Sequence, residues 1–119
     1  MYCPTEKPRP LVKKRGNLHE LKLAQPYYNQ VKNESKRFEV RKNDRDFKIS
    51  DHLLLREWSE VEGYSGNYLI CEVLTILENE NYCKRGYIIM SISLLCVCGV
   101  DLGKRECYNL RCYFKILIA

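Results

Sequence analysis

The fold class of this protein follows from residues 52–77, HLLLREWSEVEGYSGNYLICEVLTIL. Two apolar runs, 52–58 and 68–77, are rich in leucine, isoleucine and valine and have the length of strands. Short apolar runs bounded by turn residues are typical of buried β-strands. Two glycines mark residues 63–67, between the runs, as a loop. We therefore expect two strands joined by a loop.

Strand patterns continue on both sides of this pair. Apolar and polar residues alternate within 19–23 and 38–42, and residues 87–92 are mostly apolar. Alternation with a period of two places one face of a strand in the core. With the first pair, these segments make at least five strands.

One short helix is expected between the first two of these strands in chain order. Pro26 is tolerated in the first turn of a helix, and the residues after it have helical spacing. The helix should end near residues 33–35. It should place Tyr27, Tyr28 and Val31 on one face.

These elements predict an α+β domain that is mostly β, with one early helix, folded as a small barrel or sandwich. The domain should span residues 17–92. Residues 1–16 contain three prolines and a basic cluster and are expected to form a loosely ordered leader. Residues 93–119 are apolar and rich in cysteine, and we treat them as an extension whose structure the sequence leaves open.

Positive charge is concentrated in the first half of the chain. Residues 1–51 carry 13 Lys and Arg against 7 Asp and Glu, whereas residues 52–119 carry 7 against 8. A one-sided basic field attracts polyanions and is typical of nucleic-acid-binding proteins. A solvated basic face without a partner is the alternative.

The seven cysteines point to a reducing compartment. No apolar secretory segment opens the chain, and an odd number of cysteines argues against a closed disulfide framework. We therefore expect a cytoplasmic protein with reduced thiols. The apolar run 86–100 is too short for a membrane-spanning helix and is expected to be one buried strand running into a second.

No metal or cofactor site is predicted. Residues 17–92 contain no grouping of metal-ligating side chains, and the four cysteines after residue 92 lack the spacing of a familiar zinc site. His19 and His52 each stand alone and are interpreted as structural.

The basic segment 35–47, SKRFEVRKNDRDF, contains the main candidate site. Glu39 and Arg41 lie two residues apart on a strand, so they share one face. Phe38 and Val40 occupy the other face, which the alternation predicts to be buried. Lys36 should lie beside the charged pair, at the point where the helix gives way to the strand.

The trio of Lys36, Glu39 and Arg41 can have one of three roles. Arg41 and Lys36 can bind phosphate or a base edge, or Glu39 can hold both cations in a purely structural ion pair. Lys36 can also act as a base or nucleophile if its surroundings favour the neutral amine.

Basic and aromatic side chains near the trio favour nucleic acid. Cations and stacking rings together are the usual means of binding single strands. Trp58 and Tyr64 flank a loop and are the best stacking candidates, whereas Phe38 and Phe47 are expected in the core. The predicted nucleic-acid-binding residues are Lys36, Glu39, Arg41, Lys42, Arg45, Trp58 and Tyr64. Alternatively, Arg45 belongs to a turn that binds its own aspartates.

The order of motifs HELKLAQPYYNQVKNESKRFEVRKNDRDFKISDHLLLREW, GYSG, CEVLTIL and GYIIMSI resembles a small family of phage and bacterial proteins in the ASCH superfamily. The resemblance covers residues 18–92 and implies a PUA-like β-barrel. The ASCH pattern has a glycine, a lysine and, three positions later, an acidic or hydroxyl residue. Lys36 and Glu39 match the last two, and the glycine is missing.

The resemblance implies a function at the same place. ASCH-type domains are proposed to bind RNA beside the helix–strand junction, and a few relatives are hydrolases, including an amidohydrolase that acts on an acetylated cytidine. In that enzyme a lysine, a threonine three positions later and a distant glutamate take part, and Glu39 stands here in place of the threonine. Here Lys36 and Glu39 are the catalytic candidates if the protein is an enzyme, and Glu72 is the candidate for the third.

We therefore expect an RNA-binding module, or a module for another nucleic acid, that uses a basic cleft at the helix–strand junction. A hydrolase with Lys36 as base or nucleophile is the alternative. A protein partner on the basic face is not excluded. Neither membrane contact nor a cofactor is expected, and the oligomeric state stays open.

Overall fold

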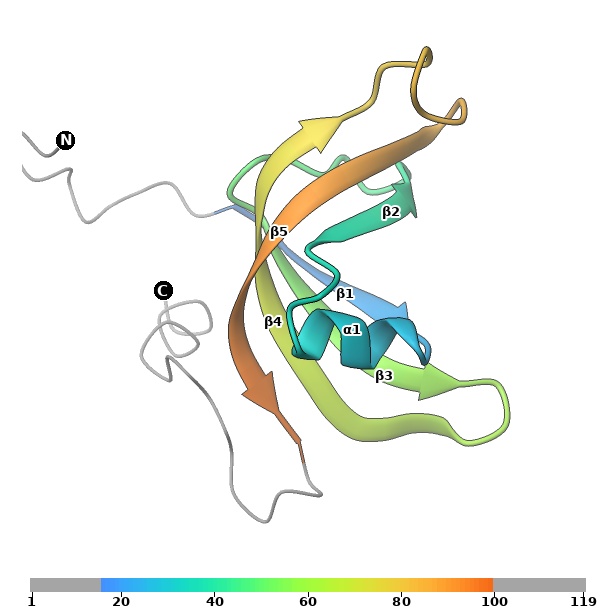
Figure 1. Cartoon of the computed structure of the whole chain (residues 1–119), viewed down its shortest axis with the longest axis vertical. Coiled ribbons are helices and arrows are strands. Elements are labelled where there is room, and N and C mark those ends of the chain that lie inside the picture. The colour runs from blue at the N-terminus through green and yellow to red at the C-terminus, as the bar shows by residue number, and fades with distance from the viewer. Residues whose placement is uncertain (1–15, 100–119) are drawn as a thin grey trace, which may run out of the picture.

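Five strands form one sheet, and one short helix lies beside it, in a computed structural model that describes residues 16–99 (Figure 1). The sheet order is β1-β3-β4-β5-β2. β1 is parallel to β3, and the other neighbouring pairs are antiparallel. In chain order the elements are β1 (Leu18–Leu23), α1 (Tyr27–Lys32), β2 (Phe38–Lys42), β3 (His52–Ser59), β4 (Gly63–Leu77) and β5 (Tyr87–Cys98).

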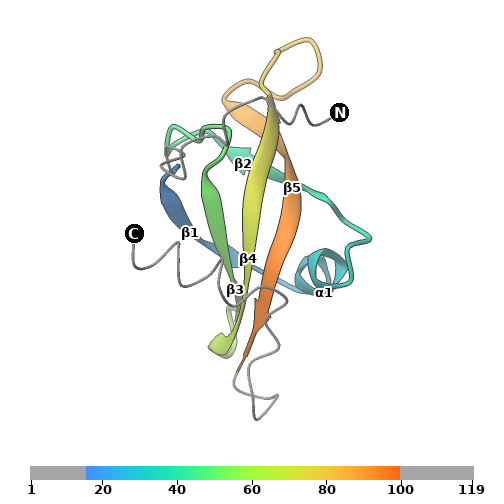
Figure 2. The same ribbon diagram turned by 90° about the vertical axis from the view of Figure 1, so that its left-hand side faces the viewer.

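The sheet curls into a half-barrel, with α1 at its open side (Figure 2). The curl brings the two edge strands, β1 and β2, close enough for a side chain of β2 to hydrogen-bond the backbone of β1. A small domain that is mostly β with one early helix is therefore confirmed. The sandwich alternative is wrong, because the strands form a single sheet that folds over its own concave face.

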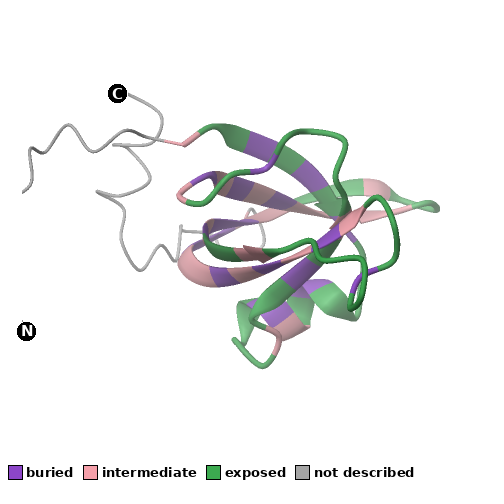
Figure 3. Ribbon diagram, turned by 90° about the horizontal axis from the view of Figure 1, so that it is seen from above, coloured by how far each residue is buried: buried purple, intermediate pink, exposed green. Residues whose placement is uncertain are grey.

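The core fills the concave side of the sheet. Leu53, Leu55 and Met90 are fully buried there, and Tyr28 and Val31 of α1 pack against them. Burial alternates along β1 and the first half of β5 (Figure 3), whereas residues 69–71 and 96–98 are buried without interruption, because Ile70, Cys96 and Cys98 form a second buried cluster. Each fully buried leucine stabilises the fold by about 2 kcal/mol, so this face fixes which side of every strand points inward.

The predicted helix is confirmed, but one of its three aromatic and aliphatic residues faces solvent. Tyr28 and Val31 are buried, whereas Tyr27 is 50% exposed. The six-residue helix presents only a narrow stripe to the sheet. Tyr27 lies outside that buried stripe and stays open to solvent.

β4 begins earlier than predicted, because the segment 63–67 is strand rather than loop. Gly63 pairs with Ser59 and Tyr64 pairs with Trp58, so only residues 60–62 form the hairpin turn. Gly63 has a φ of 72°, a backbone conformation that suits glycine. The glycines that suggested a loop instead begin a strand.

β5 runs to Cys98, beyond the predicted end at residue 92. Its second half continues to pair with β4, since Leu94 lies opposite Cys71 and Val97 opposite Leu69. The sequence assigned residues 93–98 to an extension of undetermined structure, and the structure shows that they are part of the sheet. The expectations about residues 1–15 and 100–119 lie outside the described residues.

The loop between β2 and β3 is fixed by a buried histidine–aspartate pair. Asp51 is 1% exposed and lies 2.7 Å from Nε2 of His19. It also accepts hydrogen bonds from the backbone N–H groups of Asn17 and Lys48. Phe47 is buried, as predicted, and its ring contacts that of His19. His19 is therefore part of the packing, as the sequence suggested.

Within residues 16–99, no helix has both the length and the apolar character needed to cross a membrane. The apolar run that begins at residue 86 is strand β5 up to Cys98.

Candidate functional site

A pocket of about 600 Å³ opens where α1 leads into β2, and we call it the junction pocket. Cavities of this size hold small organic ligands. The helix, the turn after it and the strand all contribute side chains. They are Tyr27, Gln30, Ser35, Lys36, Phe38, Glu39, Val40 and Arg41. The pocket thus contains the lysine, glutamate and arginine predicted from the sequence.

The turn that leads into the pocket forms without a glycine. Glu34, directly after the C-cap residue Asn33, has a φ of 64°. Glycine usually occupies this left-handed position after a helix. The backbone N–H of Lys36 then bonds the carbonyl of Gln30, which closes the turn. The absence of the ASCH-type glycine therefore leaves the tight turn intact.

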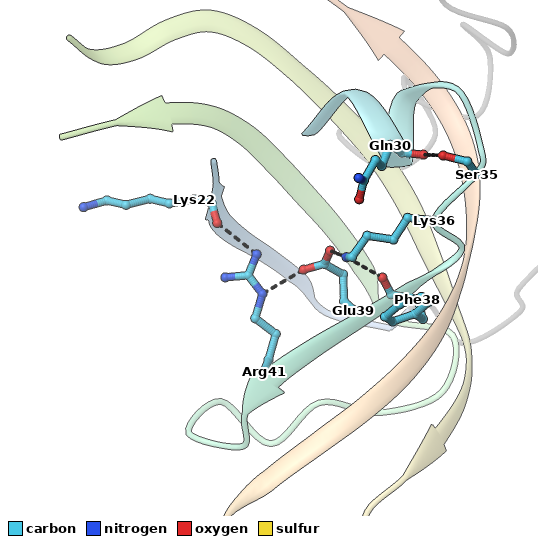
Figure 4. A network of polar contacts seen from close by, with 7 residues as sticks. All are labelled: Lys22, Gln30, Ser35, Lys36, Phe38, Glu39 and Arg41. Carbon is cyan, nitrogen blue, oxygen red and sulfur yellow. Dashed lines mark hydrogen bonds and ion pairs between the residues drawn. The ribbon is translucent and has the colours of Figure 1, made fainter. Parts of the chain in front are cut away.

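Glu39 is the buried centre of the site. It is 2% exposed, and Met90, opposite it on β5, is fully buried. Its carboxylate accepts a hydrogen bond from Nζ of Lys36 at 2.6 Å and one from Nε of Arg41 at 2.9 Å (Figure 4). Two cations thus neutralise a carboxylate that would otherwise be costly to bury.

The two faces of β2 are the reverse of the prediction. Glu39 and Arg41 share a face, as expected, but that face points inward, while Phe38 and Val40 are 45% and 51% exposed. Alternation tells which residues share a face and not which face is buried. Here the charged face points inward, and Lys36 and Arg41 together compensate the buried charge of Glu39.

Lys36 connects the ion pair to two aromatic rings. Its Nζ donates to the carbonyl of Phe38 as well as to Glu39. It also lies 4.9 Å from the centre of the Phe38 ring and 5.9 Å from that of Tyr27. The ammonium group is therefore fixed between a carboxylate and two half-exposed rings.

One terminal nitrogen of Arg41 is free to bind a ligand. Its Nε bonds Glu39 and its Nη2 bonds the backbone oxygen of Lys22, whereas Nη1 has no partner among residues 16–99 (Figure 4). Through the contact with β1, this side chain also holds the two edge strands together.

Two of the other predicted binding residues lie outside the junction pocket. Arg45 donates to the carbonyl of Glu20 at 2.6 Å and lies 3.9 Å from Asp44, so its role in the turn agrees with the structural alternative. Lys42 is exposed at the end of β2 and does not line the pocket.

Trp58 and Tyr64 line a second cavity of about 850 Å³, which we call the hairpin pocket. It is formed by the β3–β4 hairpin and the segment before α1. Its lining residues are Ala24, Gln25, Glu57, Trp58, Ser59, Glu60, Glu62, Gly63, Tyr64 and Ser65. No residue lines both pockets, so the structure does not bring the two stacking candidates together with the trio.

Glu72 does not join the trio. It stands between Cys71 and Val73 on β4, and both of these residues belong to the core. Neighbouring residues of a strand point to opposite faces, so Glu72 faces away from the concave side where Glu39 lies. The proposed third catalytic residue is therefore on the wrong face of the sheet.

Sequence reasoning missed Phe38 and Gln30 as residues of the pocket. Phe38 was expected in the core, but its ring lines the pocket beside Lys36. Gln30 lies one helical turn after Tyr27 and lines the same pocket. The helical spacing of these two residues was the available signal for their common face.

One buried thiol, that of Cys71, interacts electrostatically with Glu39 and is unreactive. Burial, together with the negative charge of Glu39, raises the pKa of Cys71 to about 12. A thiol that stays protonated is a poor nucleophile. In the part of the chain from 16 to 99, no group of three or more His, Cys, Asp or Glu side chains is placed to hold a metal ion.

Comparison with known proteins gives one family. The sequence model of a family described as a domain of unknown function (DUF3850) matches residues 18–92. The matched span begins with β1, includes both α1 and β2, and therefore contains the whole junction pocket. No curated protein matches the chain.

Proposed function

The chain belongs to the DUF3850 family, and we propose that its domain binds nucleic acid, preferably RNA, through a nucleotide held in the junction pocket. The observation that carries this proposal is the pairing of a buried charged centre with two exposed rings. Glu39, between Lys36 and Arg41, forms the polar wall, and Phe38 and Tyr27 lie beside it.

The polar groups suit an unpaired nucleotide. Nη1 of Arg41 and the third hydrogen of the Lys36 ammonium can donate to phosphate or base oxygens. Each oxygen of Glu39 accepts one hydrogen bond and has capacity for another, so an exocyclic amino group can donate to it. Donors and acceptors on one wall match the edge of a base, which carries both.

The exposed rings supply the apolar part of such a contact. Phe38 and Tyr27 are about half exposed, and rings placed this way stack on bases at a gain of about 1–3 kcal/mol per base. Core packing does not explain why two aromatic side chains are left open beside the same ammonium group.

We also propose that the half-barrel is a PUA-like barrel of the ASCH type in a cytoplasmic protein. The lysine and the acidic residue three positions later lie at the helix–strand junction, where the ASCH pattern has them. The resemblance in motif order and the curled sheet both support this assignment.

Hydrolysis of a modified nucleoside is the second candidate. Lys36 and Glu39 are 2.6 Å apart in a pocket of nucleoside size, which favours it. However, Nζ of Lys36 donates to a carbonyl and a carboxylate, so both contacts use it as a donor rather than as a base. Binding is therefore preferred over catalysis.

The test is a fluorescence-anisotropy titration of labelled single-stranded and duplex RNA and DNA at two salt concentrations. We expect RNA binding that weakens with salt. Lys36→Gln should weaken it about tenfold, because a phosphate or base contact is lost. Lys84→Gln removes the same charge from the β4–β5 connection and should leave the affinity unchanged.

Three outcomes contradict the proposal. They are binding that does not respond to salt, equal losses in both variants, and no binding to any oligonucleotide. Since Lys36 also pairs with Glu39, thermal unfolding of Lys36→Gln must show that the variant is folded at the assay temperature. In the absence of oligonucleotide binding, turnover of acylated nucleosides tests the hydrolase.

A further inference from the structure

We propose that the hairpin pocket is a second binding site, independent of the junction pocket, and that its ligand is a guanidinium group. The group is carried either by an arginine side chain of a polypeptide or by a small guanidine compound. Three features of the pocket carry this proposal: a fixed carboxylate, two aromatic walls and the charge of the lining.

The fixed carboxylate belongs to Glu57. Its oxygens accept hydrogen bonds from the side chains of Gln25 at 2.6 Å, Ser65 at 2.7 Å and Asn67 at 3.0 Å. All three donors are neutral, and no cation in residues 16–99 forms an ion pair with Glu57. The carboxylate is oriented in the pocket wall while its charge stays without a direct counter-ion.

The hydrogen bonds also keep Glu57 ionised. Partial burial favours the neutral form, but the bonds from Ser65, Asn67 and Gln25 and the more distant charge of Lys32 outweigh it, so the pKa lies below its usual value. Glu57 is therefore an anion at neutral pH.

The aromatic walls are Trp58 and Tyr64, which face each other across the β3–β4 hairpin in register. Both rings already receive a cation of this protein. The ammonium of Lys22 lies 4.5 Å from the centre of the Trp58 ring, and the guanidinium of Arg56 lies 3.7 Å from that of Tyr64. Both rings line the pocket, whereas neither Lys22 nor Arg56 does.

The charge of the lining selects a cation and disfavours phosphate. Three glutamates line the pocket, Glu57, Glu60 and Glu62, and no lysine, arginine or histidine does. Two cations lie close by: Arg56 is compensated by its ion pair with Glu20 at 2.8 Å, and Lys22, over the rings of Trp58 and Tyr64, offsets one of the three negative charges. This distribution argues against a nucleic-acid strand on Trp58 and Tyr64, which the sequence had predicted.

A guanidinium fits these features better than an ammonium. It is flat and weakly hydrated, so it stacks on a ring while its edge donates to a carboxylate. Arg56 on Tyr64 displays the stacking half of this arrangement within the same hairpin. Arg56 pairs with the carboxylate of Glu20, and in the pocket the carboxylate of Glu57 would take that role for the ligand.

The experiment uses Trp58, the single tryptophan of the chain, as its reporter. The full chain is titrated with Nα-acetyl-arginine amide and with its neutral isostere Nα-acetyl-citrulline amide, and indole fluorescence is followed together with amide NMR shifts. We expect saturable changes at residues 57–65 with the arginine compound. The citrulline compound should bind about tenfold more weakly, because the charge-assisted contact is lost.

Two variants connect the signal to the pocket. Glu57→Gln removes the charge but retains a hydrogen-bonding amide, and it should weaken the arginine compound about tenfold. Glu78→Gln makes the same change at an exposed position on the β4–β5 connection and should have no effect. Thermal unfolding of both variants checks that the hairpin is folded.

The result overturns the proposal if the arginine and citrulline compounds bind alike, if Glu57→Gln binds as well as wild type, or if no shift appears at residues 57–65. A third arm separates the two sources of the group. A Gly-Arg-Gly peptide that binds more tightly than agmatine assigns the site to a polypeptide side chain, and the reverse order assigns it to a small guanidine compound.

Discussion

Nη2 of Arg41 donates a hydrogen bond of 2.9 Å to the backbone oxygen of Lys22, and the two residues lie on opposite edge strands of the sheet. Arg45 makes a similar contact with the carbonyl of Glu20, two residues earlier on the same strand. Side chains, rather than a backbone ladder, therefore bridge the gap between β2 and β1. Since Arg41 also holds Glu39, the same residue lines the junction pocket and holds the half-barrel together.

This double role predicts a clear loss of stability for Arg41→Lys. Lysine offers a single charged centre and cannot donate to Glu39 and to the β1 backbone from a planar fork. We expect the free energy of unfolding to fall by about 1–3 kcal/mol, because the buried carboxylate of Glu39 loses a donor and the contact with β1 is lost. Urea denaturation measures it, with exposed Lys42→Ala as the control. A change as small as that of the control would show that Arg41 does not bridge the strands.

Glu39→Gln should destabilise the domain more strongly. The amide leaves two cations, Lys36 and Arg41, beside an uncharged buried group, and breaking a buried ion pair costs about 3–5 kcal/mol. Combining it with Lys36→Met should cost less than the sum of the two single changes, since one unpaired charge is removed. Chemical denaturation of wild type, the two single variants and the double variant gives the coupling free energy between Lys36 and Glu39. Strict additivity would mean that the pair is not formed.

The turn after α1 predicts a stabilising change. Glu34 has a φ of 64°, which costs a residue with a side chain about 1 kcal/mol relative to glycine. Glu34→Gly should therefore raise the free energy of unfolding by up to about 1 kcal/mol, despite the greater freedom of the unfolded chain. Lys32→Gly, inside the helix, should lower it by a similar amount. Equal destabilisation in both variants would argue against the left-handed turn.

The lowered pKa of Glu57 predicts how the stability of the fold changes with pH. The folded-state pKa lies below the value of 4.5 that the side chain has without its partners. The stabilisation is therefore fully present well above pH 4.5 and is lost as the pH falls through the folded-state pKa. We expect the unfolding temperatures of wild type and Glu57→Gln, measured between pH 3 and 7, to become more alike as the pH falls. A constant difference between the two proteins would contradict the lowered pKa.

Phe38→Leu separates stacking from folding. The ring is 45% exposed, so its loss should change the free energy of unfolding by less than about 0.5 kcal/mol. RNA affinity should fall about tenfold, because a leucine cannot stack on a base. Tyr82→Leu, which removes another exposed ring on the β4–β5 connection, should bind as wild type does. Equal affinities for Phe38→Leu and wild type would exclude the ring from the RNA contact.

Most elements were predictable because their signals are local. The alternation in β2 and the apolar runs of β3 and β5 each lie within about ten residues, and the prediction of one early helix and five strands is confirmed. The errors occurred where a local signal has two meanings. The glycines near residue 63 mark turns or strand ends equally well, and only pairing with β3 shows that β4 begins there.

By itself, the sequence determined that this is a mostly β domain and that Glu39 and Arg41 lie on one face with Lys36 beside them. Only the tertiary structure decided that this face points inward, that Phe38 and Tyr27 stay exposed, and that Trp58 belongs to a different pocket. The physical reason is that the period of a strand fixes which side chains are neighbours. Which face becomes buried depends on partners far away in the chain, here the backbone of Lys22 and the core residue Met90.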